Sequence, residues 1–232
     1  MDQIKNIIFD YDGTLHNSIK IYEPAFNKAY KYLVEKGYTE EKVFKDKDIK
    51  KWLGYNSIDM WNEFMPNLAR EEKEKCSLII GSAMIEYLNK GNAELYDGAL
   101  EILNELKHRG YRLIFLSNCK VEYMNKHKKI FKLDNYFTDF YCAEQFDFIP
   151  KYKIFKLIKK KYEGDFIVVG DRFVDIEMAT VNNVHSIGCS YGFGNNDELK
   201  NATVIAKDIK DIKELIITWD RLLNEKNMLK ES

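Results

Sequence analysis

Two carboxylates one residue apart follow an apolar run near the start of the chain. Residues 4–9 include the β-branched and aromatic types of a buried strand, and Asp10, Asp12, Gly13 and Thr14 come directly after them. Carboxylates at a strand end suit a hard cation such as Mg²⁺, which takes oxygen ligands and usually shares them with a phosphate. The same residues also fit an ordinary Asp-Gly turn, so the pattern alone leaves both interpretations open.

Two further segments carry groups that bind phosphate. Ser117 and Asn118 follow the apolar residues 112–116, and their hydroxyl and amide groups donate hydrogen bonds without adding negative charge. Lys151 stands early in a predicted helix, where its ammonium group would act as a point charge on a phosphate. A Ser-Asn pair is also common in loops, and Lys153 competes with Lys151 for the same role.

A second pair of carboxylates, Asp171 and Asp175, follows the apolar residues 165–169. Gly170 lies between this run and Asp171, and a glycine lets the backbone approach a ligand closely. Alternatively, Asp171 caps a helix and Asp175 is a solvated acid in its first turn. Each segment has such an alternative when taken singly. Because all four occur in order at strand ends or on an adjoining helix, we predict that they form one site.

Apolar strand patterns and helical patterns alternate from residue 95 onward. Strict alternation implies parallel strands joined by right-handed crossovers, with helices on both faces of the sheet. We therefore predict an α/β fold with a doubly wound, mainly parallel, Rossmann-like sheet, in which ligands bind at the carboxyl ends of the strands. The predicted strands after the first are residues 112–116, 139–142, 165–169, 186–188 and 203–206, and the predicted helices are 99–109, 121–131, 153–162, 176–182 and 209–224.

The segment between the first strand and this alternating region has a different character. Residues 17–91 lack clear strand patterns and show apolar side chains at helical spacing. We predict that they form a small α-helical cap domain inserted after the first strand. Residues 1–16 and 92–232 then form the catalytic core domain, and a cleft between cap and sheet edge would lie over Asp10.

One stretch of the predicted cap is a candidate for contact with a substrate. Residues 52–56, Trp-Leu-Gly-Tyr-Asn, lie between two helical stretches. Tyr55 and Asn56 are suited to hydrogen-bond a substrate, and Trp52 to shield it from water. A packed cap core that uses Trp52 and Trp61 is an equally good interpretation.

Composition narrows the classes of partner. Lys and Arg total 36 against 37 Asp and Glu, and a formal net charge of −1 gives no electrostatic case for a nucleic-acid partner. The four cysteines show neither metal-site spacing nor a disulfide pattern. No apolar run approaches the roughly 20 residues of a membrane span, and the first residues do not resemble a signal peptide. We expect a cytoplasmic protein without a membrane partner, acting on a small molecule.

The four segments resemble the motifs of the haloacid dehalogenase superfamily, matched in order across nearly the whole chain. The family's Asp-x-Asp-Gly-Thr corresponds to residues 10–14, and its Gly-Asp-x-x-x-Asp to residues 170–175. Its motif-two hydroxyl residue corresponds to Ser117 and its motif-three lysine is best placed at Lys151. The prolines that usually follow this lysine in the resembling branch are absent.

The position of the helical insert is similar to that in the subfamily with an α-helical cap. Residues 95–98 and 191–199 are similar to the phosphoglycolate phosphatase and β-phosphoglucomutase branch of that subfamily. This resemblance implies an Mg²⁺-dependent phosphatase that hydrolyses a small phosphorylated metabolite through an aspartyl-phosphate.

The resemblance also implies a role for each motif residue. Asp10 would attack phosphorus, and Asp12 would protonate the leaving oxygen and then activate water. Mg²⁺ would be held by the side chains of Asp10 and Asp171 and the backbone carbonyl of Asp12, with Asp175 close by as a metal or neighbouring group. The phosphoryl group would be bound by Gly13, Thr14, Ser117, Asn118 and Lys151.

Two other functions remain open at this point. A phosphomutase of the β-phosphoglucomutase type would use the same Asp10 and Asp12 and return the phosphoryl group to a sugar. A phospho-ligand sensor without turnover is disfavoured, because a binding protein needs no paired nucleophile and acid. Asp12 itself favours phosphoryl transfer over carbon–halogen cleavage, since the latter has no alkoxide leaving group to protonate.

Overall fold

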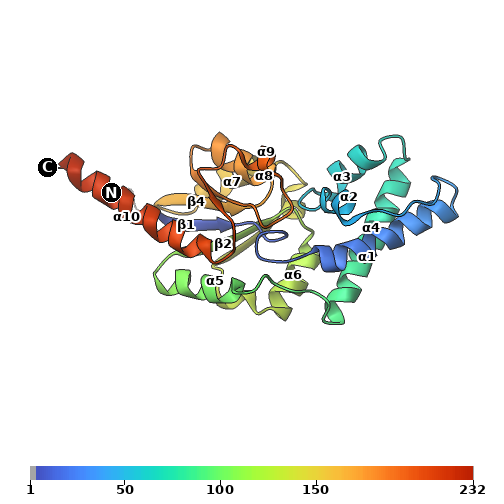
Figure 1. The fold of residues 1–232 in the computed structure, drawn as a ribbon, viewed down its shortest axis with the longest axis horizontal. Helices are drawn as coiled ribbons and strands as arrows, with labels where there is room; N and C mark the ends of the chain where they lie inside the picture. Colours follow the sequence, from blue (N-terminus) through green and yellow to red (C-terminus); the bar gives the residue numbers. More distant parts are fainter. Residues whose placement is uncertain (1–3, 232) are drawn as a thin grey trace.

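The computed structural model describes residues 4–231, with the side chains of Asp46 and of residues 223–231 left aside. Six parallel strands form one sheet in the order β3-β2-β1-β4-β5-β6 (Figure 1). The strands are β1 Ile4–Phe9, β2 Arg112–Ser117, β3 Asp139–Cys142, β4 Asp165–Gly170, β5 His185–Cys189 and β6 Val204–Ala206. The predicted α/β class and parallel sheet are confirmed.

Helices cover both faces of this sheet. Figure 1 shows α5 and α6 on one side of it and α7 and α8 on the other. Alternate side chains of a strand point to opposite faces, and accordingly Ile7 joins one apolar cluster with Leu103 of α5 while Ile8 joins another with Phe155 of α7. The core helices are α5 Ala99–His108, α6 Val121–Ile130, α7 Lys151–Lys159, α8 Phe173–Val181, α9 Asn196–Leu199 and α10 Asp211–Glu231, with short 3₁₀ turns at Leu133–Asn135 and Ala143–Phe146.

The register of the central strands determines which loops meet. β1 lies between β2 and β4, with Phe9 paired to Phe115 on one side and to Val169 on the other. The backbone N–H of Asp10 donates to the Val169 carbonyl at 2.9 Å. Three strands therefore end side by side at the same edge, which brings together Ser117 at the end of β2 and the loops that carry Asp10 and Asp171.

Four helices lie between β1 and α5 in the chain, at that edge of the sheet. They are α1 Ile19–Glu35, α2 Asp46–Lys50, α3 Ser57–Phe64 and α4 Arg70–Asn89, and Figure 1 shows them grouped beside the end of the sheet. Phe26 of α1 and Trp61 of α3 each contact the Phe64 ring, at centroid distances of 5.3 and 5.8 Å. These aromatic contacts pack the helices on one another, and Phe26 and Trp61 belong to the same apolar cluster as Ile7 of the sheet.

Some element boundaries differ from the sequence expectations. Helix α7 begins at Lys151, two residues earlier than predicted, because Pro150 has a φ of −53° and lies at its N-cap. Helix α8 begins at Phe173 instead of residue 176. The short helices α2 and α9 have five and four residues, too few to show a periodic apolar pattern.

No helix in the described part of the chain has the length and apolarity needed to cross a membrane.

Candidate active site

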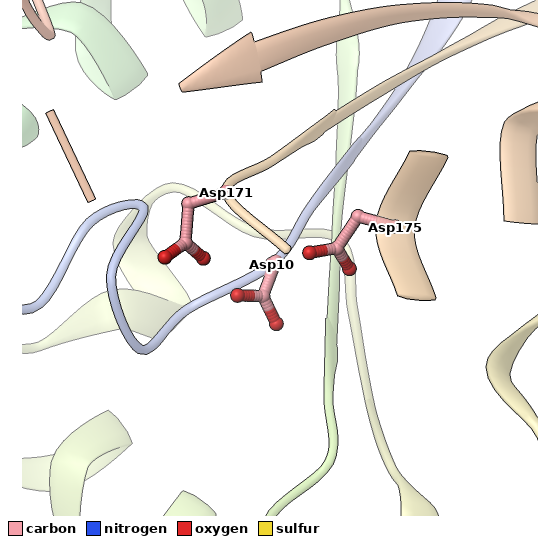
Figure 2. A group of neighbouring side chains, drawn as sticks. All are labelled: Asp10, Asp171 and Asp175. Atoms are coloured by element: carbon pink, nitrogen blue, oxygen red, sulfur yellow. The ribbon is translucent and has the colours of Figure 1, made fainter. Parts of the chain in front are cut away.

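Three aspartates from two strand ends and one helix converge in the interior. Asp10 follows β1, Asp171 follows β4 and Asp175 lies in the first turn of α8. One carboxylate oxygen from each lies within 4.8 Å of the others, and Figure 2 shows the three side chains facing a common point. All three residues are buried, with exposed fractions of 4% or less. This is an oxygen-only ligand set of the kind that hard divalent cations take.

Burial and mutual repulsion perturb these carboxylates. Burial, followed by the negative charge of Asp175, raises the pKa of Asp10 to about 7. Burial and then the charge of Asp10 raise the pKa of Asp171 well above its usual range. Concentrated negative charge out of water is unfavourable without a compensating cation. The residues present therefore fit a bound divalent metal ion.

One cation is already built into the cluster. The Lys151 ammonium donates to Asp10 Oδ1 at 2.6 Å and to Asp175 Oδ1 at 2.7 Å, and the lysine side chain is only 2% exposed. Burial alone would lower the pKa of Lys151, but the charges of Asp10 and Asp175 outweigh it and raise that pKa. Lys153 is exposed, and its ammonium lies 6.0 Å from the centre of the Tyr152 ring. The structure thus brings Lys151, and not Lys153, to the carboxylates.

The turn after β1 is packed directly against Asp171. Gly13 has a φ of +91°, and a Cβ there would lie 2.2 Å from Asp171 Oδ2. The same oxygen accepts a hydrogen bond from the Phe193 backbone N–H at 2.7 Å. Only glycine suits this position, since the backbone conformation and the close carboxylate both exclude a side chain.

Asp12 is not among the three clustered carboxylates, and its own carboxylate is held by two donors. His16 Nδ1 lies 2.8 Å from Asp12 Oδ1, and the Tyr123 hydroxyl donates to the same oxygen at 2.7 Å. Both contacts end on Oδ1, which leaves Oδ2 available to a ligand. Burial would raise the pKa of Asp12, but the hydrogen bond and charge of His16 outweigh it and lower that pKa.

A second histidine lies beneath this pair. His127 on α6 is fully buried, and its Nδ1 lies 2.8 Å from the Tyr11 hydroxyl. Its ring centre is 4.6 Å from that of His16 and 4.1 Å from that of Tyr123. Burial, and then the nearby His16, lowers the pKa of His127 to about 2. His127 is therefore a neutral part of the packing under Asp12.

The predicted phosphate-binding groups take different positions. Ser117 ends β2 and lines the same cavity as Asp10 and Asp12. Asn118 lines it too, but its Nδ2 donates to the Gly54 carbonyl of the cap at 2.9 Å.

Gly13 and Thr14 make contacts within the turn. The Gly13 N–H donates to the His16 carbonyl at 2.9 Å, and the Thr14 hydroxyl lies 3.5 Å from Asp10 Oδ2 and 3.4 Å from Asp171 Oδ1. Ser117 thus lies on the cavity wall, whereas Gly13 and Thr14 shape the carboxylate cluster.

Comparison with known proteins assigns the family. The family model for haloacid dehalogenase-like hydrolases matches residues 7–189. This chain belongs to that family. The match covers most of the chain and contains all four motif segments, so the resemblance noted from the sequence is confirmed and the protein is a hydrolase.

The individual relatives have low sequence identity to this chain, at most 30% for those named here. Phosphoglycolate phosphatase from Colwellia psychrerythraea is 24% identical over 204 residues, which cover 83% of this chain and 87% of the relative. A 5′-nucleotidase from Pseudomonas aeruginosa is 30% identical over 112 residues, and the match spans half of that relative and 46% of this chain. The crystal structure of a predicted phosphatase from Clostridium acetobutylicum has a TM-score of 0.77 at 22% identity, covering 93% of this chain and 99% of that one. This likeness supports the fold.

In this haloacid dehalogenase-like hydrolase, the loop before α3 closes over the motif residues. The cavity that contains Asp10 and Asp12 is also lined by Trp52, Leu53, Gly54 and Tyr55. The prediction that this loop faces the site therefore agrees with the structure. Trp52 also packs on Phe64, with ring centres 5.4 Å apart, so it serves both the cavity wall and the cap core.

Asn56 does not have the position suggested by the sequence. Its side chain accepts hydrogen bonds from the backbone N–H groups of Ile58 and Asp59, at 3.0 and 2.9 Å, and so caps α3. An asparagine directly before a helix is a favoured N-cap, because its oxygen satisfies otherwise unpaired N–H groups. The suggestion that Asn56 hydrogen-bonds a substrate is wrong in this respect.

The sequence analysis missed the groups that hold Asp12 and the cap loop. His16 lies four residues after Asp12, just beyond the motif at residues 10–14, and this proximity was a usable signal. Tyr123 and His127 are four residues apart on α6, a spacing that puts them on one helix face, but nothing local links them to Asp12. Arg172 carries no sequence signal for its contacts, which are with the distant residues 51–53 and Glu198.

Proposed function

We propose that this hydrolase is an Mg²⁺-dependent phosphatase that cleaves a small phosphorylated metabolite through an aspartyl-phosphate. The observation that carries the proposal is that two carboxylates lining one cavity have different hydrogen-bond partners. Asp10 is tied to Lys151, whereas Asp12 is held through one oxygen by His16 and Tyr123. A nucleophile and a proton-transfer group need different surroundings, and these two have them.

The chain's own residues account for each step. Asp10 would attack phosphorus, and Lys151 and Ser117 would contact the phosphoryl oxygens, where negative charge is spread in the transition state. The Asp12 carboxyl would give its proton to the leaving oxygen and later take one from the attacking water. An arriving phosphate would raise the pKa of Asp12 and so favour its protonated form before bond cleavage.

Asp10, Asp171 and Asp175 are the groups that would hold the metal ion, with the Asp12 carbonyl as a further ligand. The cluster fits because three buried carboxylates converge there, while Lys151 is bonded to Asp10 and Asp175 and not to Asp171. A bound Mg²⁺ would reduce the repulsion between the anionic nucleophile and the anionic substrate.

The names of two relatives support phosphomonoesters as the substrate class. One relative is called a phosphoglycolate phosphatase and the other a 5′-nucleotidase.

We also propose that the protein acts in the cytoplasm, where its four thiols would stay reduced, and that it has no nucleic-acid or membrane partner.

The first test is phosphate release from a panel of phosphomonoesters with Mg²⁺, with EDTA and with the Asp10→Asn variant. We expect release only with metal, and a loss of at least about 10³-fold in kcat for the variant, because the amide keeps the shape but is no nucleophile. Thermal unfolding in parallel should show a higher Tm with Mg²⁺, as for any ligand of the folded state.

The control is the Asp208→Asn variant, which changes a carboxylate near the start of α10, outside the cavity. It should retain wild-type activity. Metal-independent release, or full activity of Asp10→Asn, would contradict the mechanism. An isomerised sugar phosphate without free phosphate would point to the phosphomutase alternative.

A further inference from the structure

The cavity over the motif residues extends well beyond the space for a phosphate. Its volume open to water-sized molecules is about 170 Å³, well above the roughly 10–15 Å³ that one water molecule needs. Its core-side wall contains Asp10, Asp12 and Ser117, where the phosphate belongs according to the proposed function. The rest of the substrate must therefore lie against α1, α3, α4 and the loop before α3.

This cap-side wall is apolar and rich in aromatic rings. Its side chains come from α1, from the loop before α3, from α3 itself and from α4. The aromatic and large apolar side chains of this wall include Tyr22, Trp52, Tyr55, Trp61, Ile80 and Met84. Rings and thioethers of this kind form favourable contacts with a flat apolar partner.

Charged groups are confined to the other side of the cavity. Besides the two aspartates, the charged lining residues within the described chain are Lys120 and Glu122, both at the start of α6. The cap contributes none. A carboxylate placed deep against the cap would lose its hydration without gaining a cation there. The Ser77 hydroxyl in this wall already donates to the Lys73 carbonyl at 2.8 Å.

The aromatic wall contains two buried indole N–H donors, those of Trp52 and Trp61. Trp52 and Trp61 are 4% and 1% exposed, and the indole N–H of each has no hydrogen-bond acceptor among the described residues. Buried donors are normally paired, and leaving one unpaired is unfavourable. Because both residues line the cavity, a ligand acceptor atom that reached either donor would satisfy it, whereas a purely hydrocarbon ligand would not.

We propose that the substrate is the phosphate ester of an alcohol that carries a flat heteroaromatic ring with hydrogen-bond acceptors. Nucleoside 5′-monophosphates belong to this class. The ring would lie among Tyr22, Trp52 and Tyr55, and its acceptor atoms would meet an indole N–H. The inference rests on the proposed function for the place of the phosphate, and it adds the chemistry of the leaving group.

The test compares kcat/KM for adenosine and uridine 5′-monophosphates with that for ribose 5-phosphate, which keeps the sugar and phosphate but lacks the ring. We expect a preference of about tenfold or more for at least one nucleotide. Phosphoglycolate is included as the carboxylate comparison and should be used less well than that nucleotide. Equal or higher kcat/KM for ribose 5-phosphate or phosphoglycolate overturns the inference.

Variants then test the indole N–H groups. Trp52→Phe and Trp61→Phe keep a ring but remove the donor, and at least one should raise KM for the nucleotide by about threefold or more while leaving ribose 5-phosphate unaffected. Trp219→Phe is the matched control, because Trp219 lies on α10 against His185 and is not part of the cavity wall. Losses that are the same for all substrates would mean a structural role only.

Failure of the proposed function has a different signature. Release from p-nitrophenyl phosphate without any preference for nucleotides leaves the proposed function intact and overturns the inference. Absence of release from every ester, p-nitrophenyl phosphate included, contradicts the proposed function. In that case calorimetric titration of the folded wild-type protein with adenosine 5′-monophosphate and with ribose 5-phosphate decides the inference, which requires tighter binding of the nucleotide.

Discussion

At the scale of single residues, the site separates its two catalytic candidates by their hydrogen bonds. Asp10 lies in a buried cluster with Lys151, whereas Asp12 Oδ1 is the shared acceptor of His16 and Tyr123. Both contacts restrict the rotation of the Asp12 carboxyl group. Its other oxygen is then aligned for proton transfer, which depends steeply on geometry. Tyr123 is thus a positioning residue that acts through Asp12.

This role makes Tyr123→Phe sensitive to the leaving group. An alkyl phosphate needs protonation of its leaving oxygen, whereas p-nitrophenolate leaves without it. We expect the variant to lose about 10-fold or more in kcat/KM, which reports the step that expels the leaving group, with an alkyl phosphate, and much less with p-nitrophenyl phosphate. Steady-state kinetics with both esters measure the difference. Tyr111→Phe, which removes a hydroxyl bonded to Asp220, is the control, and equal losses for both esters would refute the positioning role.

At the scale of elements, one arginine of the core holds the cap loop. Arg172 donates to the carbonyls of Lys51 and Leu53, and its Nε donates to Glu198 at 2.8 Å. Its guanidinium also lies 5.2 Å from the centre of the Tyr55 ring. Gly54 has a φ of +87°, and a Cβ there would lie 2.6 Å from Arg172 Cγ. The loop is therefore fitted closely to this side chain.

Arg172→Lys should weaken the hold of the core on the loop. A lysine keeps the charge, but it lacks the planar guanidinium group. Its single ammonium cannot contact the two carbonyls and Glu198 together. We expect KM for the preferred phosphomonoester to rise about 5- to 10-fold with a smaller change in kcat, because the loop forms part of the substrate wall. Arg109→Lys, an exposed change at the end of α5, should behave as wild type. An unchanged KM would exclude this function of Arg172.

The elements themselves were largely predictable, and their contacts across the fold were not. Strand 139–142 is as predicted, because short apolar runs between turns are local signals. Lys151 and Lys153 were not separable by sequence, since the choice depends on where α7 begins and which side chain then faces Asp10. The contacts of Tyr123 with Asp12 and of Arg172 with the cap join residues more than 100 positions apart, which no local pattern encodes.

At the scale of the whole molecule, the active-site edge of the sheet is built around buried ionisable groups. His127 is a clear case, since it is fully buried under Asp12 and is surrounded by Tyr11, His16 and Tyr123. Its pKa is lowered to about 2, first by burial and then by His16. The unfolded chain, in contrast, would protonate this histidine near pH 6.5. Folding therefore competes with protonation in mildly acidic solution.

The sign of the resulting pH dependence follows from that difference. Stability from a neutral buried His127 is fully present above about pH 6.5 and declines as pH falls below it, by about 1.4 kcal/mol between pH 7.5 and pH 5.5. Urea unfolding in EDTA should show this loss, and His127→Gln, which keeps a polar partner for the Tyr11 hydroxyl, should lack that part of it. His108→Gln, at an exposed position of α5, should keep the wild-type slope. Identical slopes for wild type and His127→Gln would mean that this histidine titrates normally in the folded protein.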